Sequence, residues 1–391
     1  MTPLDQIPYR RLFPWLHVFR AIGLAFSFRQ LLVAAGAIGA LWLGEFLIAR
    51  LASDSVGTVR FPSTHLQLQA QLLVNVIENR PSEIRDGVTP IPVFSLAAIS
   101  DLAGPWQDIT LPAIVATNSN MPASLRWQSA VGCTWGASVW SLFGLALCRL
   151  AARRLARDEE GSFRKAIQFG VTRWRHGVVA PVIPAAAALS LMGFAVLLAL
   201  PGRFPFAGSF NAVVATPFIL GCGLVASFLT FATILGWPLM LAAIAYDDCD
   251  GFGGLSRSYS LWTGRPWRFA WCVLMAAAGG CVGMFVAALL AFGSGHAADY
   301  AIRLGMGNSI AAGWAGTTCK FLIMSAITSY AFSFFWTSAT IVYALLRQSV
   351  DGVPLDVMAP DDDERPARDP LPVVGMPAVN PSEPPTSSAT G

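Results

Sequence analysis

The sequence predicts an all-α polytopic membrane protein with about six transmembrane helices, two cytoplasmic interfacial amphipathic helices and a small exterior segment. Only 13% of the 391 residues are charged and 54% are hydrophobic, whereas soluble proteins carry about 25% charged residues. The apolar residues are also gathered into long charge-free stretches. Length alone would suggest two or three soluble domains, but this composition excludes them.

The apolar stretches are long enough to cross a bilayer. A membrane-spanning helix needs about 20 mostly apolar residues, because a rise of roughly 1.5 Å per residue must cover about 30 Å of hydrocarbon. The first span is predicted at residues 31–51, where Glu45 interrupts the apolar run. Four arginines precede it, which favours an uncleaved helix over a secretory signal. The five remaining helices of the bundle, within residues 127–346, are predicted at 127–148, 177–202, 204–246, 269–298 and 321–346.

The distribution of basic residues predicts the orientation. With six spans and a cytoplasmic N-terminus, 18 of the 26 Lys and Arg residues fall on the cytoplasmic side, as the positive-inside rule requires. Dividing the long stretch 204–246 into two helices would move the last two basic groups outside. We therefore expect one helix there, with Pro217 and Pro238 as natural kinks. The predicted localisation is the cell inner (plasma) membrane, with several passes and both termini cytoplasmic.

The segments outside the spans differ in composition. Residues 1–30 form a cytoplasmic N-terminal segment. Residues 52–126 form the one sizeable water-facing segment, expected to be a small exterior cap with a helix over residues 64–79. Frequent Pro residues predict loops and short extended pieces in the rest of it. After Arg347 the chain is polar and contains frequent Pro, so residues 347–391 are predicted to be a disordered cytoplasmic tail.

The two cytoplasmic connections predict surface helices. Apolar residues recur at helical spacing in the first, with basic residues between them, as in an interfacial amphipathic helix. Its apolar stripe consists of Phe163, Ile167, Val171 and Trp174. A shorter stripe follows at residues 255–262 in the second connection. Span, surface helix and span thus occur twice, which predicts an internal repeat of residues 128–200 and 211–292; shared interface composition is the alternative explanation.

The second connection also carries a family resemblance. An acidic-Gly start leads to an L-x-x-S helix and a G-x-x-W entry to the next span. The residues concerned are Asp250, Gly251, Leu255, Arg257, Ser258, Leu261, Gly264, Trp267 and Arg268, together with Tyr343, Arg347 and Gly352 in "IVYALLRQSVDG". This pattern resembles a broad group of bacterial integral-membrane proteins similar to the six-helix membrane domain of some glycerophosphodiester phosphodiesterases. The resemblance covers residues 149–352 and implies a helical membrane bundle with interfacial helices. The catalytic barrel is missing, so no activity is implied.

No motif in the sequence identifies a reaction. None of the four histidines lies in the central part of a span, so neither an intramembrane haem nor a zinc hydrolase centre is predicted. There is no G-x-x-x-x-G-K-[ST] phosphate loop. The seven cysteines include no C-x-x-C pair and are typical of core residues. A net charge of +3 does not indicate the strongly basic surface that is typical of nucleic-acid-binding proteins. We expect no cofactor, metal site, catalytic residue or nucleic-acid partner.

Two groups of charged residues are candidate sites. Glu45 and Lys320 lie at matching depths in the first and sixth spans, so we expect them to face one another or a common polar cavity, as a structural staple or, alternatively, an ion-coupling site. The candidate lipid-head or cation contacts at the cytoplasmic mouth of the fourth span are Asp247, Asp248, Asp250, Arg257 and Arg268. Carboxylates there suit Mg²⁺ or, with the arginines, a phosphate-bearing lipid head. The alternative is acids that stabilise a helix start through its dipole.

These features favour a non-enzymatic integral membrane protein that organises the membrane, assembles with a partner or handles lipids at the cytoplasmic face. The first alternative is a transporter or channel for a small or lipidic substrate, favoured by the predicted repeat and the Pro-interrupted fourth span. The second is a membrane-bound lipid enzyme using the acidic cluster. The expected partners are the lipid bilayer and either a membrane protein or a second copy, for which Gly279 and Gly283 have the small-x-x-x-small spacing of a dimer face.

Overall fold

The computed structural model describes residues 14–51, 61, 102–118, 120–203, 208–307 and 309–359. All elements below belong to the unit Met1–Met358; of the second unit, Ala359–Gly391, only the first residue is described. All regular structure in these ranges is helical, which confirms the all-α class. Six of the helices are long and apolar enough to cross a membrane, which confirms the predicted number of candidate spans.

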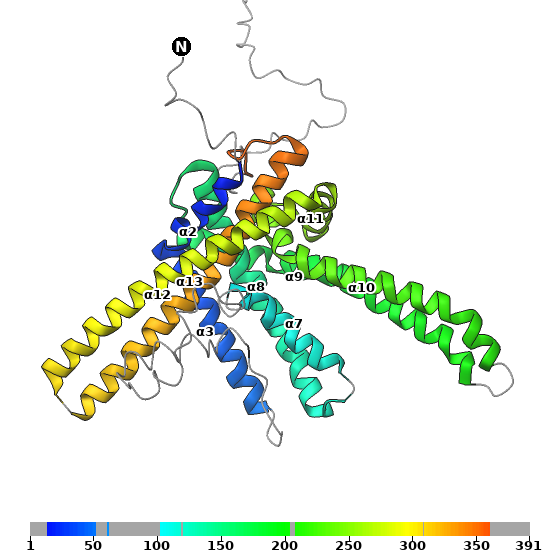
Figure 1. Ribbon diagram of the computed structural model, residues 1–391, viewed down its shortest axis with the longest axis horizontal. Helices are drawn as coiled ribbons and strands as arrows, with labels where there is room; N and C mark the ends of the chain where they lie inside the picture. The colour runs from blue at the N-terminus through cyan, green and yellow to red at the C-terminus, as the bar shows by residue number, and fades with distance from the viewer. Residues whose placement is uncertain are drawn as a thin grey trace, which may run out of the picture. The chain divides into compact units, whose positions relative to one another are not determined.

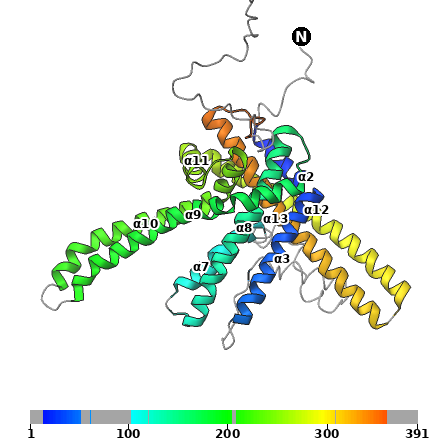
Figure 2. The same ribbon diagram turned by 180° about the vertical axis from the view of Figure 1, so that it is seen from behind.

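Long helices that follow one another in the chain run antiparallel. They are α3 (Phe28–Leu51), α8 (Ala123–Arg157), α9 (Phe163–Ala199), α10 (Gly208–Asp247), α12 (Pro266–Met306) and α13 (Ile310–Asp351). The short elements are the 3-10 helices η2 (Pro14–Phe19) and η5 (Leu200–Arg203), and the α-helices α2 (Arg20–Ala25), α7 (Gly104–Thr117) and α11 (Gly251–Gly264). Figures 1 and 2 show α9 beside α10, and α12 beside α13, as two long hairpins.

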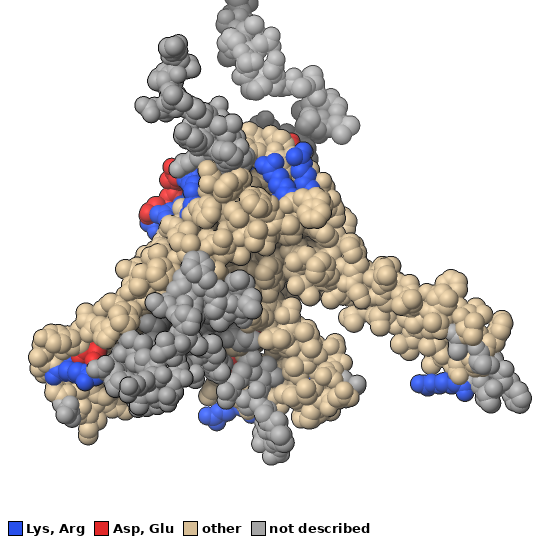
Figure 3. Space-filling model, in the orientation of Figure 1, with Lys and Arg blue, Asp and Glu red and all other residues tan. Residues whose placement is uncertain are grey.

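Polar contacts define one end of the bundle, which we call the charged end. It comprises the start of α3, the end of α8, the start of α9, the end of α10, α11, the start of α12 and the end of α13. Arg29 at the start of α3 donates to the carbonyl oxygen of Gly161 at 2.8 Å, and Arg149 in α8 donates to the carbonyl oxygen of Ala245 at 2.8 Å. Charged side chains gather at this end, whereas the long helices beyond it are largely uncharged (Figure 3).

An aromatic core holds α8, α10 and α13 together. Trp140 and Trp336 are fully buried, with ring centroids 6.0 Å apart, and Phe332 lies 5.0 Å from Trp140. Trp237 of α10 packs edge-on against Trp336 at 5.1 Å. Farther along, α9 and α10 expose many large apolar side chains. Such a surface suits lipid rather than water.

The N-terminal segment and the start of the predicted tail are packed on the bundle. In the part expected to be a plain cytoplasmic segment, Ala21 and Ala25 of α2 are fully buried, and Phe26 stacks on Tyr330 with ring centroids 4.2 Å apart. At the other terminus α13 continues to Asp351 and Met358 is buried. Residues 347–358 therefore do not belong to a disordered tail. The rest of that predicted tail, from residue 360 onward, lies outside the described residues.

The predicted exterior segment contains a helix that belongs to the bundle. Helix α7 packs along α8 and buries Asp108 and Pro112. Its 14 residues reach only about 21 Å, too short to cross a bilayer. Pro105 lies in the first turn, where a missing N–H is tolerated, so the frequent prolines did not prevent a helix here. The helix expected over residues 64–79 lies outside the described residues.

The two predicted surface helices differ in the structure. The first is not a separate element, because α9 runs unbroken from Phe163 to Ala199 and includes the stripe Phe163, Ile167, Val171 and Trp174. The second is a separate helix, α11, which ends at Gly264 before Pro266 begins α12. A location at a membrane surface stays a prediction for both, as does the internal repeat. Helix α10 is continuous through Pro217 and Pro238, which confirms one helix rather than two.

Gly170 of α9 permits the close approach of α9 to α8. A Cβ at Gly170 would lie 2.4 Å from the carbonyl oxygen of Leu142, whereas a Cβ at Gly193, also in α9, meets nothing within 4 Å. We expect Gly170→Ala to lower the free energy of unfolding by about 1–3 kcal/mol through overpacking. Gly193→Ala is the matched control and should be neutral or stabilising by up to about 1 kcal/mol. Unfolding in mixed detergent micelles measures both; equal effects would contradict the packing argument.

Candidate functional site

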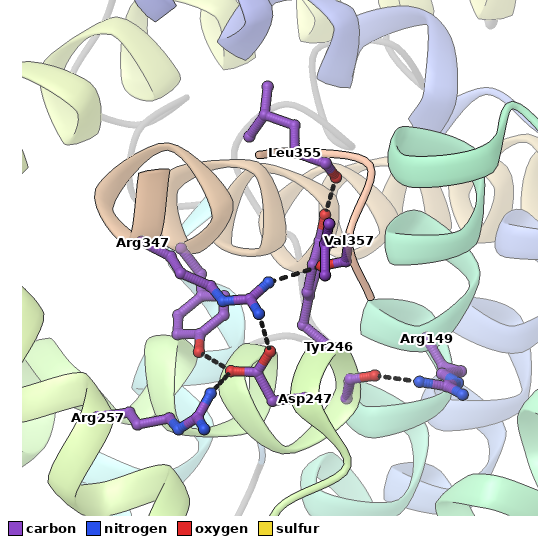
Figure 4. Close-up of polar contacts among 9 residues, drawn as sticks. Arg149, Tyr246, Asp247, Arg257, Arg347, Leu355 and Val357 are labelled. Carbon is purple, nitrogen blue, oxygen red and sulfur yellow. Dashed lines mark hydrogen bonds and ion pairs between the residues drawn. The ribbon is translucent and has the colours of Figure 1, made fainter. Parts of the chain in front are cut away.

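The carboxylate of Asp247 is the meeting point of three helices at the charged end. It is the last residue of α10, and its side chain is only 5% exposed. Arg347 of α13 donates to it at 3.2 Å, and Arg257 of α11 and the hydroxyl of Tyr343 also donate to it (Figure 4). We call Asp247, Arg257, Tyr343 and Arg347 the Asp247 hub. Two guanidinium groups share one carboxylate, so the hub carries one net positive charge.

The hub also holds the segment after α13. Arg347 donates through its second nitrogen to the carbonyl oxygen of Val357 at 2.7 Å, and its guanidinium lies 5.4 Å from the ring centre of Tyr246 (Figure 4). The hydroxyl of Tyr246 donates to the carbonyl oxygen of Leu355. Arg347 is therefore shared between the hub and residues 355–357, which explains why this segment is packed rather than free.

The three acids of the predicted cluster have different partners. Asp248 has φ of 51°, and its carboxylate pairs with Arg173 of α9 at 2.8 Å. The Asp250 carboxylate accepts from the backbone N–H of Gly253 at 2.8 Å and caps α11, which agrees with the helix-start alternative for this residue. In the described ranges no group of three or more His, Cys, Asp or Glu side chains is placed to hold a metal ion. Arg268 lies on the first turn of α12 rather than in the hub.

Two further polar groups at this end were missed by the sequence analysis. Arg149 is buried, and its guanidinium lies 4.9 Å from the ring centre of Phe169. His176 accepts through Nδ1 from the backbone N–H of Gly251 at 3.3 Å, and so contributes to the start of α11. Both residues border apolar stretches, and nothing in their spacing indicates partners 75 or more positions away.

Cys249 is not an activated nucleophile. Burial, followed by the nearby charge of Asp247, raises the pKa of its thiol to about 11. The thiol is therefore protonated at neutral pH, whereas catalytic cysteines act as thiolates. All seven cysteines are free thiols.

A second set of buried polar side chains lies inside the bundle. Asp108 of α7 is fully buried and accepts from the indole N–H of Trp140 at 3.0 Å. Gln30 of α3 accepts through Oε1 from the hydroxyls of Ser333 and Thr337 at 3.0 and 3.2 Å. The sequence analysis did not single out either group, because Asp108 was assigned to a water-facing segment and Gln30 precedes the first apolar run.

Glu45 and Lys320 lie on neighbouring helices. The rings of Trp42 and Phe321 are 5.1 Å apart, which brings the outer part of α3 beside the outer part of α13. The carboxylate of Glu45 accepts from the backbone N–H of Phe61. A direct pair or shared cavity between Glu45 and Lys320 stays a prediction.

Comparisons with protein-family models, curated proteins and solved structures give no match. The resemblance to the membrane domain of glycerophosphodiester phosphodiesterases therefore stays a prediction, and the function is argued from the geometry of the charged end.

Loss of the Asp247 charge should destabilise the folded protein. Asp247→Asn would leave two guanidinium groups facing a neutral amide, and breaking a buried ion pair typically costs about 3 kcal/mol or more. We expect the free energy of unfolding in detergent to fall by about 3 kcal/mol. The matched control is Asp299→Asn, which removes an exposed pair with Arg303 one turn apart on α12. That change should cost less than about 1 kcal/mol. Similar losses in the two variants would show that the hub does not hold the helices together.

Proposed function

We propose that the chain is a non-enzymatic, multi-pass protein of the inner membrane that organises the bilayer by holding lipids at its cytoplasmic face. The observation that carries the proposal is the composition of the charged end. Its acids are largely engaged by internal partners, while exposed aromatic side chains, Phe252 at 65% and Trp267 at 87%, flank the arginines of α11 and α12. Aromatic residues favour the boundary between hydrocarbon and water, and arginines near the surface attract anionic lipids.

The proposed orientation puts the charged end and both termini in the cytoplasm. The support is the positive-inside distribution, with 18 of 26 basic residues in segments of this end or of the adjoining termini. In bacterial-type membranes the cytoplasmic leaflet presents anionic headgroups that such a surface attracts.

The lipid enzyme proposed as an alternative is less favoured by the geometry. Asp247, Asp248 and Asp250 are engaged by an ion-pair hub, an arginine and a helix N-terminus respectively. Catalysis on a lipid would need at least one of these carboxylates to be available for a metal or a proton transfer. A scaffold that holds its own acids in place fits the contacts better.

Co-purified lipid tests the proposal. We expect the full-length protein, extracted with native lipids in polymer nanodiscs and analysed by mass spectrometry, to be enriched in anionic lipids over the bulk membrane. Arg268→Gln removes a positive charge at the charged end and should reduce the enrichment about fivefold, which corresponds to about 1 kcal/mol per surface arginine. Arg203→Gln, the control at the far end of the α9 hairpin, should leave it unchanged. A lipid composition equal to the bulk membrane would overturn the proposal.

One observation favours the second candidate, a transporter. Asp108 is a fully buried carboxylate on a helix too short to span the membrane. Buried intramembrane acids and interrupted helices are typical of ion and substrate pathways. Its indole partner, Trp140, belongs to the aromatic core that joins α8 to α13.

A flux assay separates this candidate from the scaffold. If the chain carries protons or sodium ions, proteoliposomes containing it should show faster flux than empty liposomes. Asp108→Asn keeps the side-chain shape and the acceptor for Trp140 but cannot hold the charge, so flux should fall to the empty-liposome level. Wild-type flux equal to that of empty liposomes would leave Asp108 with a structural role and would contradict transport of these ions.

A further inference from the structure

A cavity of about 310 Å³ lies at the charged end, between the start of α3, the end of α8 and the loop that leads to α9. Its lining residues are Ser27, Phe28, Arg29, Gln30, Leu150, Arg154, Glu160 and Gly161. None of these residues belongs to the Asp247 hub. The volume is at the lower limit of pockets that bind small molecules and far exceeds the share of one water.

The charges in the cavity are unbalanced. Arg29 approaches one carboxylate oxygen of Glu160 at 3.3 Å, and Arg154 approaches the other at 2.5 Å. Two guanidinium groups therefore share a single carboxylate, which leaves one net positive charge among the lining residues. Arg154 has five N–H donors, and its one hydrogen bond in the described part of the chain is to Glu160. The remaining donors are available to an anion.

The acid that occupies the arginines is easily displaced. Glu160 is 62% exposed and lies on the short connection between α8 and α9, outside any helix. The backbone carbonyls of Glu160 and Gly161 accept from Arg29 at 2.9 and 2.8 Å. The loop can thus stay attached through its backbone while the side chain of Glu160 moves away.

An unpartnered amide nitrogen and a helix N-terminus adjoin the cavity. Gln30 is 1% exposed, and its Nε2 amide nitrogen has no hydrogen-bond partner in the described residues, although its Oε1 is fully used. A buried donor without a partner costs about 1–3 kcal/mol. The N-terminus of α3 adds positive partial charge at this place, since α3 begins at Phe28. An oxyanion in the cavity would meet the arginine donors and the positive end of α3.

The surroundings of the cavity favour a lipid over a free ion. Phe28, on the cavity wall, is 77% exposed, and Leu32 one turn along α3 is also exposed. These side chains continue from the cavity toward the apolar surface of α3. A ligand with a phosphate at one end and acyl chains at the other contacts both surfaces at once.

We propose that this cavity binds the phosphate of a lipid headgroup, with Arg29 and Arg154 donating to the phosphate oxygens and Glu160 competing for the same donors when no lipid is present. The proposal rests on the proposed lipid handling and names one site for it. The effect of removing the Glu160 charge distinguishes binding of an anion from attachment of the loop. Removing its charge strengthens binding of an anion but weakens the attachment of the loop.

Charge-matched variants of the full-length protein in detergent test the site, with short-chain phosphatidylglycerol as the probe. Arg154→Gln should weaken its binding about tenfold, because a charge-assisted hydrogen bond of this kind contributes roughly one decade in affinity. Glu160→Gln should tighten binding about threefold. Arg164→Gln removes the same charge from an exposed position of α9 and should change affinity less than twofold. If Arg154→Gln fails to fold, Arg154→Lys replaces it and should weaken binding about threefold.

Two soluble phosphate compounds serve as further probes to identify the class of ligand. Glycerol 3-phosphate and inorganic phosphate should bind at least tenfold more weakly than the lipid; equal affinity would assign the cavity to a soluble phosphate compound and overturn the lipid proposal. Unchanged binding in both Arg154 and Glu160 variants, or weaker binding after Glu160→Gln, would also overturn it. If the wild-type protein is enriched in anionic lipids while these variants have no effect, the cavity assignment alone fails. Absence of that enrichment overturns the broader function instead.

Discussion

The arrangement of the charged end depends on one buried carboxylate. Asp247 terminates α10 and accepts from donors on the following helix α11 and on α13, about 100 positions away, so a single side chain joins three helices. Removing an ion from water is costly, and the cost is offset only when partners with good geometry surround it. The hub meets this condition with two arginines and a tyrosine. Arg347 extends the hub to the packed segment after α13.

The hub and the aromatic core stabilise different parts of the bundle. At the charged end, directional contacts select one arrangement, because the donors of Arg257, Tyr343 and Arg347 converge on one carboxylate. About three turns inward, Trp140, Trp237 and Trp336 fill the space between α8, α10 and α13. Beyond them each hairpin depends on contacts between its own two helices, α9 with α10 and α12 with α13. Lipid can then cover the outer faces without competing with these contacts.

The sequence predicted the features that depend on local composition. The six candidate spans follow from charge-free stretches, and the undivided α10 follows from the way basic residues alternate between the segments. The pairings were not predictable, because Arg347 lies 100 positions from Asp247 and either could have faced water. Asp250 is the exception, since the cap of a helix depends on residues three positions apart.

The structure differs from the predictions mainly where one sequence pattern is compatible with two local structures. Prolines in residues 104–117 suggested a loop, yet one lies in the first turn of α7, where it is compatible with a helix. The amphipathic stripe from Phe163 to Trp174 suggested a separate helix, but no residue there stops the backbone from continuing into the span. Composition also placed Arg29 and Glu160 at the same end of the bundle without indicating that they share a cavity.

The length of α10 has a mechanical consequence for the bilayer. Forty residues extend about 60 Å, twice the thickness of a typical hydrocarbon layer, so the helix is accommodated by inclination, by extension beyond the layer at the charged end or by a thicker layer around it. Its partner α9 is nearly as long. In the inclined arrangement the hairpin would occupy a wide area of the bilayer, and local lipid order would become part of the energetics of the folded protein.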